Sequence, residues 1–307
     1  MLVKLAICIQ DRCMELQQLR YVVTVAELGN FTRAAERCFV VQSALSHQIA
    51  RLEQELGARL FHRTSRQVKL TPAGQAFLPA ARQCLDAADR ARAEVAAATG
   101  EIRGRLSVGA IPTVAAVDVP AAMRALHERH PHVRVGLTTG ASDALVRRVT
   151  DGRLDLAFLG LPAGATVHGV RDHVLATDRH VAVLATDHRL ATAKRLRLAR
   201  LAEEVFVDFP AGSTGRAQTD EAFQAAGLVR DVAFEVTDVH LMAALVREGL
   251  GIGLLPAAFV PALEGVATVA VTGAPARAEH VVWSRLGPSP VAAAFLEQLE
   301  VDWRSVE

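Results

Sequence analysis

The stretch Gln42-Ser43-Ala44-Leu45-Ser46-His47-Gln48-Ile49 decides how the first part of this chain folds. It follows Thr32-Arg33-Ala34-Ala35-Glu36 after a short turn, and a basic segment, FHRTSRQVKL at residues 61–70, comes after it. Two short helices joined by a turn and followed by a hairpin are typical of a winged helix-turn-helix, whose second helix fits the major groove of DNA. The order of these segments therefore predicts that the chain binds double-stranded DNA.

The ends of these helices can be placed from local signals. The hydroxyl of Thr32 is predicted to cap a helix over residues 33–38. The recognition helix is predicted over residues 42–56, with its start at residue 42 or 43, because Gly57 favours a helix C-terminus. Helical spacing predicts a buried stripe on this helix made of Leu45, Ile49, Leu52 and Leu56.

A long helix is predicted after the hairpin, from Pro72 to about Thr99, with proline at the first helical position. Its apolar residues recur every three or four positions over three heptads, as in a coiled coil. We expect this seam to pair two copies of the chain, and packing against its own domain is the alternative. The seam consists of Phe77, Ala81, Cys84, Ala88, Ala91 and Val95.

From Arg105 onward, short β-rich runs alternate with helical stretches, which indicates α/β sheets with largely parallel pairing. Strands are predicted over residues 106–110, 133–138, 155–159, 181–184, 205–208, 232–236, 252–255 and 281–284. Helices are predicted over residues 121–129, 143–150, 216–226 and 239–247.

Charge is distributed unevenly along the 307 residues, a length that suits two or three domains at about 100–200 residues each. Residues 1–100 carry 13 Lys or Arg and 9 Asp or Glu, a balance of +4, whereas residues 101–307 carry 21 and 24, a balance of −3. A modest local excess of positive charge suits a sequence-specific DNA binder better than a protein that coats DNA.

Several protein classes are excluded by the sequence. No apolar run approaches the roughly 18 residues of a membrane span, so we expect a cytoplasmic protein without a membrane partner. The four cysteines show no metal-binding spacing, and neither a metal nor a bound cofactor is expected. Enzyme motifs such as HExxH, GxSxG and the P-loop are missing from the sequence, so the chain is not expected to be an enzyme.

The residues resemble those of LysR-type transcriptional regulators. The resemblance is carried by MELQQLRY (residues 14–21), FTRAAE (31–36) and QSALSHQI (42–49), and by Leu52-Glu53, Leu56-Gly57, Leu60-Phe61, Arg63, Arg66 and residues 70–74. Downstream, GRLDLA (152–157) and LVREGLGIGLLP (245–256) are similar to two recurrent segments of that family's effector domain. The match at residue 14 favours Met14 as the natural start.

This resemblance implies an α/β multidomain protein. Residues 1–13 would be an extension, 14–71 a winged helix-turn-helix domain with its helix-turn-helix at about 31–50, and 72–100 a linker helix that forms a dimerisation coiled coil. Residues 101–307 would form an effector-binding domain of two lobes, similar to periplasmic binding proteins. Lobe I would comprise about 101–177 and 275–307, and lobe II about 178–274, so that the chain crosses near Thr177 and Ala274.

DNA contacts carry over from the family residue by residue. Base contacts are expected from Gln42, Ser43, Ser46 and His47 on the recognition helix and from Arg66 on the wing. Phosphate contacts are expected from Thr32, Arg33, Arg51, Arg63 and Lys69. Glutamine can pair with an adenine edge, and arginine suits a narrow minor groove. Gln42 and Ser43 have the alternative role of helix caps, and His47 can contact a phosphate instead of a base.

An effector site is expected beyond the ends of strands and at helix starts, where exposed N–H groups favour anions. The candidates are Thr113, Gly140, Ser142, Ser213, Thr214, Arg216 and His240. Ser142 is expected to cap a helix, and Arg216 is a candidate clamp for a ligand carboxylate, since its planar fork matches that group. Helix caps or surface side chains are the alternative for each residue.

The predicted function is therefore a DNA-binding regulator that responds to a small-molecule inducer of unknown identity, for which a carboxylate is one candidate. We expect an activator that represses its own promoter, acting as a homodimer or homotetramer with RNA polymerase as a partner. The alternatives are a constitutive repressor with a silent pocket, or a module for binding or transporting a small molecule. Because no cysteine follows Cys84, the peroxide-sensing mechanism of some family members is not expected.

Overall fold

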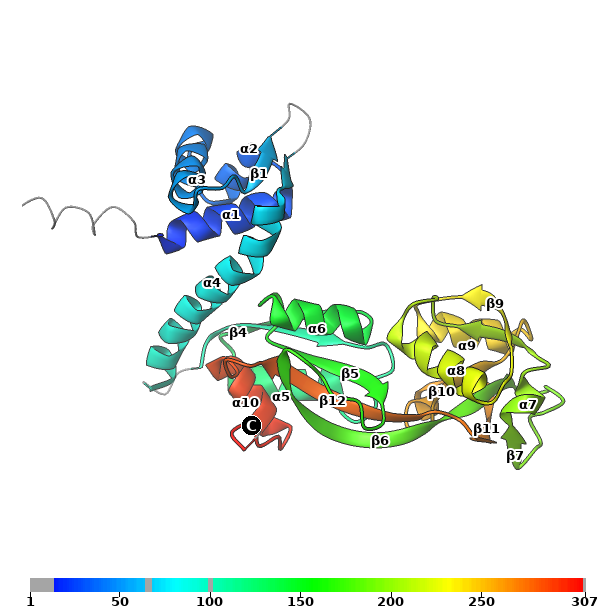
Figure 1. Cartoon of the computed structure of the whole chain (residues 1–307). Helices are drawn as coiled ribbons and strands as arrows, with labels where there is room; N and C mark the ends of the chain where they lie inside the picture. The colour runs from blue at the N-terminus through cyan, green and yellow to red at the C-terminus, as the bar shows by residue number, and fades with distance from the viewer. Residues whose placement is uncertain (1–13, 64–67, 99–101, 306–307) are drawn as a thin grey trace, which may run out of the picture. The chain divides into compact units, whose positions relative to one another are not determined.

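The computed structural model describes residues 14–63, 68–98 and 102–305, and it divides into two compact units. One unit comprises residues 1–95 with 151–153, and the other comprises 96–150 with 154–307. The first contains the predicted helix-turn-helix and the second the predicted effector domain, and each is described by itself below (Figure 1).

The first unit consists of three helices, a two-stranded wing and a long helix. These are α1 (Leu16–Leu28), α2 (Phe31–Arg37), α3 (Gln42–Leu56), β1 (Phe61–Arg63), β2 (Val68–Leu70) and α4 (Pro72–Ala98). The wing strands pair antiparallel, and the side chain of Glu53 on α3 accepts hydrogen bonds from the backbone N–H groups of Leu60 and Phe61, at 2.8 and 3.2 Å. This contact fixes the wing to the recognition helix.

Two predictions about these helices were wrong in detail. Asn30, not Thr32, caps α2, because its side-chain oxygen accepts from the N–H of Arg33 at 3.0 Å and the helix begins at Phe31. Leu56 is 41% exposed, because it lies in the last turn of α3, beyond the buried stripe of Leu45, Ile49 and Leu52. The predicted bounds of α3 and its end at Gly57, which has a φ of 67°, are confirmed.

Helix α4 begins where predicted, and its seam divides into two parts. The hydroxyl of Thr71 accepts from the N–H of Gly74 at 3.0 Å and donates to the carbonyl of Arg59 at 2.6 Å. Within the single chain, Phe77 packs against the core of its own unit and Ala81 is buried. Cys84 and Ala91 are exposed, and Val95 is 69% exposed, so the seam beyond residue 81 is the part available to a second chain.

The second unit is built on one long sheet path in the order β4-β3-β5-β12-β6-β11-β7, with β10 also pairing with β6. In lobe I, β3 (Gly104–Ala110) pairs parallel with β4 (Val133–Thr139) and β5 (Leu156–Pro162). Helices α5 (Val119–Arg129), α6 (Ser142–Thr150) and α10 (Pro290–Gln298) belong to the same lobe. Its core surrounds the fully buried Trp283.

Two long strands join the lobes. β6 (Val170–Ala185) and β12 (Ala276–Ser284) pair antiparallel over nine residues, from Ala276 opposite Arg179 to Ser284 opposite Val170. Figure 1 shows both strands running from one lobe of this unit into the other. The expectation of largely parallel pairing was therefore wrong for this part of the sheet, because both pairings of β12 are antiparallel and β6 pairs antiparallel with β10, β11 and β12.

Lobe II contains a second, two-stranded parallel sheet and several short elements. Its elements are β7 (Arg195–Arg197), α7 (Leu198–Leu201), β8 (Val205–Asp208), α8 (Thr214–Ala225), β9 (Asp231–Glu235), α9 (Val239–Arg247), β10 (Gly253–Pro256), η1 (Val260–Ala262) and β11 (Val266–Thr272). The sequence analysis did not predict β7, α7, η1 or β11, nor α10 in lobe I. In the described residues, no helix is both long and apolar enough to cross a membrane.

A close approach at Gly74 gives a stability test for the first unit. A Cβ on Gly74 would lie 2.1 Å from the carbonyl oxygen of Leu60, whereas one on Gly57 would meet nothing within 4 Å. Gly74→Ala should lower the free energy of unfolding by about 3 kcal/mol through overpacking. Gly57→Ala should cost only about 1 kcal/mol, from its positive φ. Urea unfolding followed by circular dichroism measures both, and equal costs would contradict the close approach.

Candidate functional site

The start of α3 presents an uncapped, exposed polar surface. The N-cap residue is Val41, whose side chain makes no capping hydrogen bond, so neither Gln42 nor Ser43 is the cap. Gln42, Ser43 and His47 are exposed, and Ser46 is half-buried. The base-edge donors and acceptors predicted for the major groove therefore lie on the open face of this helix.

Positive side chains accompany this surface. Arg33 on α2, Arg51 on α3 and Lys69 on β2 are exposed, and none of them has an ion-pair partner within the described residues. Thr32 is exposed as well. Arg66, and the side chain of Arg63, lie outside the described residues. Uncompensated cations beside a polar helix start are the arrangement that phosphate contacts require.

Two exposed apolar residues of the turn before α3 were not singled out from the sequence. Phe39 is 95% exposed and has a positive φ of 57°, and Val41 is 68% exposed. Apolar side chains this exposed are unusual in a turn, and their signal in the sequence was an apolar run, Phe39-Val40-Val41, where polar turn residues were expected.

The second unit contains a cavity of about 730 Å³. This effector cavity is lined by residues from both predicted lobes and by the starts of α6, α8 and α9. They are Ile111, Pro112, Thr113, Thr139, Gly140, Ala141, Ser142, Gly160, His180, Phe209, Pro210, Ser213, Gly215, Gln218, Thr237, Asp238, Val239, His240, Pro256 and Arg277. Its size falls within the range of about 300–1,000 Å³ that is usual for small-molecule sites.

The backbone of Gly160, on β5, is a hydrogen-bonding centre of the cavity wall. Its carbonyl accepts from the hydroxyl of Ser142 at 3.2 Å and from the side-chain amide of Gln218 at 3.1 Å. Since Ser142 lies on α6 and Gln218 on α8, this one carbonyl connects helices of the two lobes. A Cβ at position 160 would lie 2.7 Å from the Cδ1 atom of Ile111, so a larger residue would require that side chain to shift.

Arg277, on β12, is the buried cation of the cavity, and its charge is already paired. Its guanidinium donates to Asp178, to Glu279 and to both oxygens of Thr113, at 3.0–3.4 Å. Glu279 also accepts from the N–H groups of Ala115 and Ala116, and burial raises the pKa of its carboxyl. All five donors of Arg277 are therefore used, and it holds the loop after β3 against the two long strands.

His180, on β6, is uncharged at neutral pH. It is 5% exposed, and burial lowers its pKa from 6.5 to about 4, against the raising effect of its contact with the carbonyl of Pro275. Among residues 14–63, 68–98 and 102–305, no group of three or more His, Cys, Asp or Glu side chains is placed to hold a metal ion.

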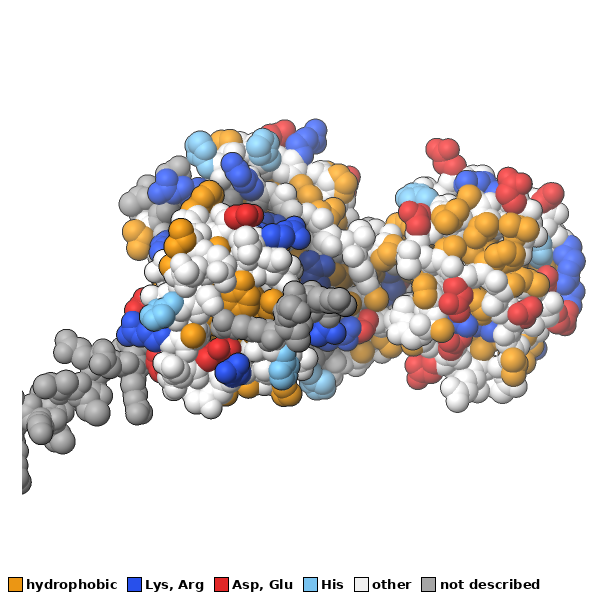
Figure 2. Space-filling model, turned by 90° about the horizontal axis from the view of Figure 1, so that it is seen from above, with side chains coloured by type: hydrophobic (Ala, Val, Ile, Leu, Met, Phe, Trp, Pro, Cys, Tyr) orange, Lys and Arg blue, Asp and Glu red, His pale blue; other side chains and the backbone are white. Residues whose placement is uncertain are grey.

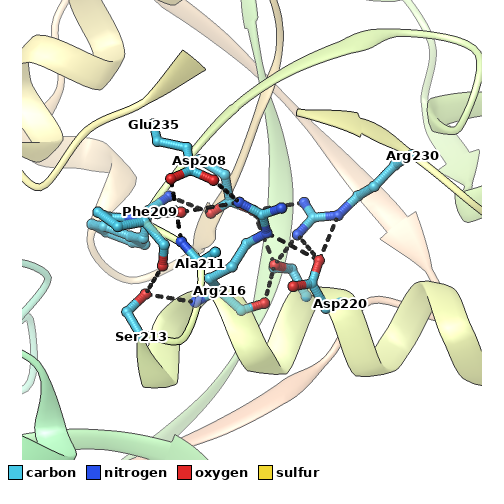
Figure 3. Close-up of polar contacts among 10 residues, drawn as sticks. Asp208, Phe209, Ala211, Ser213, Arg216, Asp220, Arg230 and Glu235 are labelled. Carbon is cyan, nitrogen blue, oxygen red and sulfur yellow. Dashed lines mark hydrogen bonds and ion pairs between the residues drawn. The ribbon is translucent and has the colours of Figure 1, made fainter. Parts of the chain in front are cut away.

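Arg216 lies in a separate charge network of lobe II (Figure 3). Its side chain donates to Asp220 at 3.0 Å, to Glu235 at 3.1 Å and to the carbonyl of Phe209 at 3.2 Å. Arg230, in turn, contacts Asp208 and Asp220, each at 2.6 Å. These contacts hold the start of α8 against the ends of β8 and β9.

The pKa values in this network follow from burial and pairing. Burial raises the pKa of Asp208, although Arg230, the N–H of Phe209 and Thr219 act against this. Burial would also raise the pKa of Asp220, but hydrogen bonds from Arg230 and Arg216 bring it below its usual value. Arg230 additionally stacks over Phe206 and Phe223, with its guanidinium 5.1 and 5.2 Å from the ring centroids.

Lobe II as a whole is acidic. Residues 178–274 contain 12 Asp or Glu and 9 Lys or Arg. Figure 2 shows acidic side chains spread between apolar ones over this lobe, at the right of the view. A surface of this charge does not attract DNA phosphates, in contrast to the start of α3.

Comparison with known proteins finds a family match for each of the two parts of the chain. Residues 16–75 match the family described as bacterial regulatory helix-turn-helix protein, lysR family, and residues 99–303 match the LysR substrate binding domain. The chain belongs to the LysR family. It is a DNA-binding transcriptional regulator with an effector-binding domain, and the fold expected from the sequence is confirmed.

Individual relatives of this LysR-family chain cover most of its length. The transcriptional dual regulator GltC of Bacillus subtilis is 35% identical over 79% of this chain and 81% of its own. ShiR of Corynebacterium glutamicum is 36% identical over 78% of this chain and 82% of its own. Among solved structures, a full-length OxyR variant from Pseudomonas aeruginosa has a TM-score of 0.76 at 25% identity, covering 96% of this chain and 98% of that one. CbnR complexed with its target DNA has a TM-score of 0.64 at 28% identity, covering 94% and 99%.

The structure brings most of the predicted effector residues of this LysR-family regulator together. Thr113, Gly140, Ser142, Ser213 and His240 line the cavity, whereas Thr214 and Arg216 do not. That Arg216 clamps a ligand carboxylate stays a prediction, and in the structure three side chains and a carbonyl engage its guanidinium. Ser142 does not act as a cap, since its hydroxyl bonds to Gly160 on β5.

Among the cavity residues that were missed from the sequence, four matter most for its wall. Gly160, Gln218 and Arg277 carry its hydrogen-bond network, and His180 lies in its wall. His180 directly precedes a predicted strand, where a polar residue beside an apolar run is a signal, whereas Arg277 lies four residues before the predicted strand 281–284. Gln218 had no local signal, because it is an ordinary residue of an amphipathic helix.

The depressed pKa of His180 predicts a pH dependence of stability. Because the folded state keeps this imidazole neutral while the unfolded chain protonates it below pH 6.5, its contribution to stability falls as the pH drops from 6.5 to about 4. The loss should approach about 3 kcal/mol. Urea unfolding of the protein and of His180→Gln over this range measures it, and pH profiles that run parallel would contradict it.

Proposed function

We propose that this regulator reads its operator with the start of α3, where Gln42, Ser43, Ser46 and His47 contact base edges. The observation that carries this proposal is the uncapped, exposed polar start of α3 beside cations without partners among the described residues. Arg33, Arg51 and Lys69 supply phosphate contacts, with Thr32 and Arg63 beside them, and Arg66 reaches the minor groove. CbnR, which is similar to this chain, has been solved with its target DNA.

We propose further that a small molecule in the effector cavity controls this DNA binding. The lining includes apolar residues such as Ile111 and Phe209 together with hydroxyl, imidazole and amide groups, which suits a small polar ligand. Arg277 has no donor left for that ligand, so a carboxylate inducer would be held by N–H groups at the helix starts and not by a clamp of arginine.

The mechanism requires more than one copy of the chain. We propose that exposed seam residues of α4 pair two chains, that a further contact forms a tetramer, and that the tetramer bends DNA between two sites. Inducer binding shifts the dimers and exposes the promoter to RNA polymerase in the cytoplasm. This scheme holds only if the inducer binds one arrangement more tightly than the other. Light scattering tests it, and a strictly monomeric protein would rule it out.

The proposed roles predict different effects on DNA affinity for a variant of a base contact and a variant of a phosphate contact. Gln42→Ala should relax the preference for one base pair by about tenfold. Arg51→Ala should weaken binding to all sequences alike and lower the slope of log affinity against log salt by about 1. Both are measured by fluorescence anisotropy on operators selected from random DNA. Arg129→Ala, on α5, is the matched control, and a change there equal to that of Arg51→Ala would contradict the assignment.

The effector proposal is tested at the start of α9. His240 lines the cavity, whereas the neighbouring Leu241 is 51% exposed and does not. A nuclease footprint on DNA flanking the protein's own gene, with and without an extract of cell metabolites, should change with metabolites for the wild type and for Leu241→Trp. His240→Trp should keep the footprint and lose the response, because the ring narrows the cavity. A response retained in His240→Trp would contradict the assigned cavity, and a footprint that ignores metabolites in the wild type would indicate a silent pocket.

A further inference from the structure

Lobe I contains a second hollow, of about 290 Å³, which is separate from the effector cavity. We call it the arginine hollow. It is formed by the loop before β6, the start of β6 and the residue after β12. Its lining residues are Val167, His168, Gly169, Val170, Arg171 and Arg285.

The arginine hollow lies far from the inducer site along the same strand. Arg171 is near the start of β6, and His180, which lines the effector cavity, lies nine residues further along it. At about 3.3 Å per residue, this separation is about 30 Å along the strand. The two hollows therefore share no lining residue and can be occupied independently.

The hollow brings two arginines from different segments together. Arg171 lies on β6, opposite Trp283 of β12. Arg285 is the first residue after β12, in the turn that follows it, and it lines the same hollow as Arg171. Two guanidinium groups at such positions repel each other unless an anion lies between them.

No carboxylate of the described residues neutralises this pair. Neither Arg171, Arg285 nor His168 has an ion pair within the part of the chain that the structure describes. The adjacent Asp172 points to the other face of β6, where its carboxylate bonds to His280 at 2.8 Å. The hollow is therefore a concave site with two arginines, a histidine and no counterion from the described residues.

We propose that the arginine hollow binds a tetrahedral oxyanion, either inorganic phosphate or the phosphoryl group of a small metabolite. The planar forks of Arg171 and Arg285 match the oxygens of such a group and bind it through charge-assisted hydrogen bonds. Gly169, with a φ of 83°, belongs to the same wall, and its N–H has no partner among the described residues. The volume is at the lower end of small-molecule sites, which leaves room for a phosphoryl group and only a small remainder.

Occupancy of the hollow would have a measurable consequence. An anion that binds only the folded protein stabilises it by mass action and removes the repulsion between the two arginines. The effector domain would then respond to two ligands, an inducer between the lobes and an oxyanion at the far end of β6.

The test uses isothermal calorimetry on the full-length protein with inorganic phosphate, at constant ionic strength and with acetate as a second probe. Phosphate should bind the wild type at least several-fold more tightly than acetate. Arg285→Gln should weaken it about tenfold, and Arg171→Gln/Arg285→Gln should abolish it. Arg134→Gln, an exposed arginine on β4 outside the hollow, is the matched control and should bind phosphate as the wild type does.

The possible outcomes decide the proposal. Phosphate binding that is weakened by the hollow variants and not by Arg134→Gln supports it, provided that circular dichroism and thermal unfolding show the variants to be folded. Equal phosphate affinity in all variants would place the ion outside the hollow and overturn the proposal, as would a wild type without phosphate binding. Equal affinity for acetate and phosphate would overturn the ligand class. None of these results bears on whether metabolites change the footprint, so the effector proposal is tested separately.

Discussion

The antiparallel pairing of β6 with β12 is the interaction on which the effector domain depends. These two strands are the connection between its lobes, and their nine paired residues include Arg171 and Arg277, with His180 directly after the last pair on β6. The effector cavity lies beside this ladder, since His180 comes from one strand and Arg277 from the other. A ligand that draws the lobes together or separates them must therefore bend the two strands.

Ion pairs of buried arginines hold segments of the effector domain that are not part of the β6–β12 pairing. Arg277 fixes the loop after β3 through Thr113 and pairs with the buried Glu279 and the half-buried Asp178. Arg230 with Arg216 fixes the start of α8 through Asp208 and Asp220. Removing one partner of such a pair leaves a charge unpaired in the interior, which typically costs about 3–5 kcal/mol. The same pairing leaves Arg277 without a free donor, so this cation holds the wall of the cavity in place and offers no hydrogen bond to a ligand.

The DNA-binding unit is organised in the opposite way. Its helices carry an apolar core around Leu45, Ile49 and Leu52, while its polar groups at the start of α3 remain exposed and the nearby cations have no ion-pair partner among the described residues. Exposed groups of this kind can exchange their bound water for base edges and phosphates with little rearrangement of the protein. Opposite charge on the two parts of the chain, basic at the start of α3 and acidic over lobe II, directs phosphates to the first.

The sequence by itself determined the winged helix-turn-helix, the bounds of α3 and the long helix from Pro72, because these follow from local periodicity, caps and glycine stops. It also placed most strands of the effector domain and five residues that line its cavity, since helix starts carry local signals. Only the tertiary structure decided that Asn30 caps α2 and that β12 pairs antiparallel with β6. It also decided that acidic neighbours pair with Arg216, and that Gln218 and Arg277 belong to the cavity. The cap at Asn30 is a local contact with Arg33, but the others depend on partners distant in sequence, such as Glu235 for Arg216, Asp178 for Arg277 and Gly160 for Gln218. No local pattern encodes which distant side chains the fold brings within hydrogen-bonding distance.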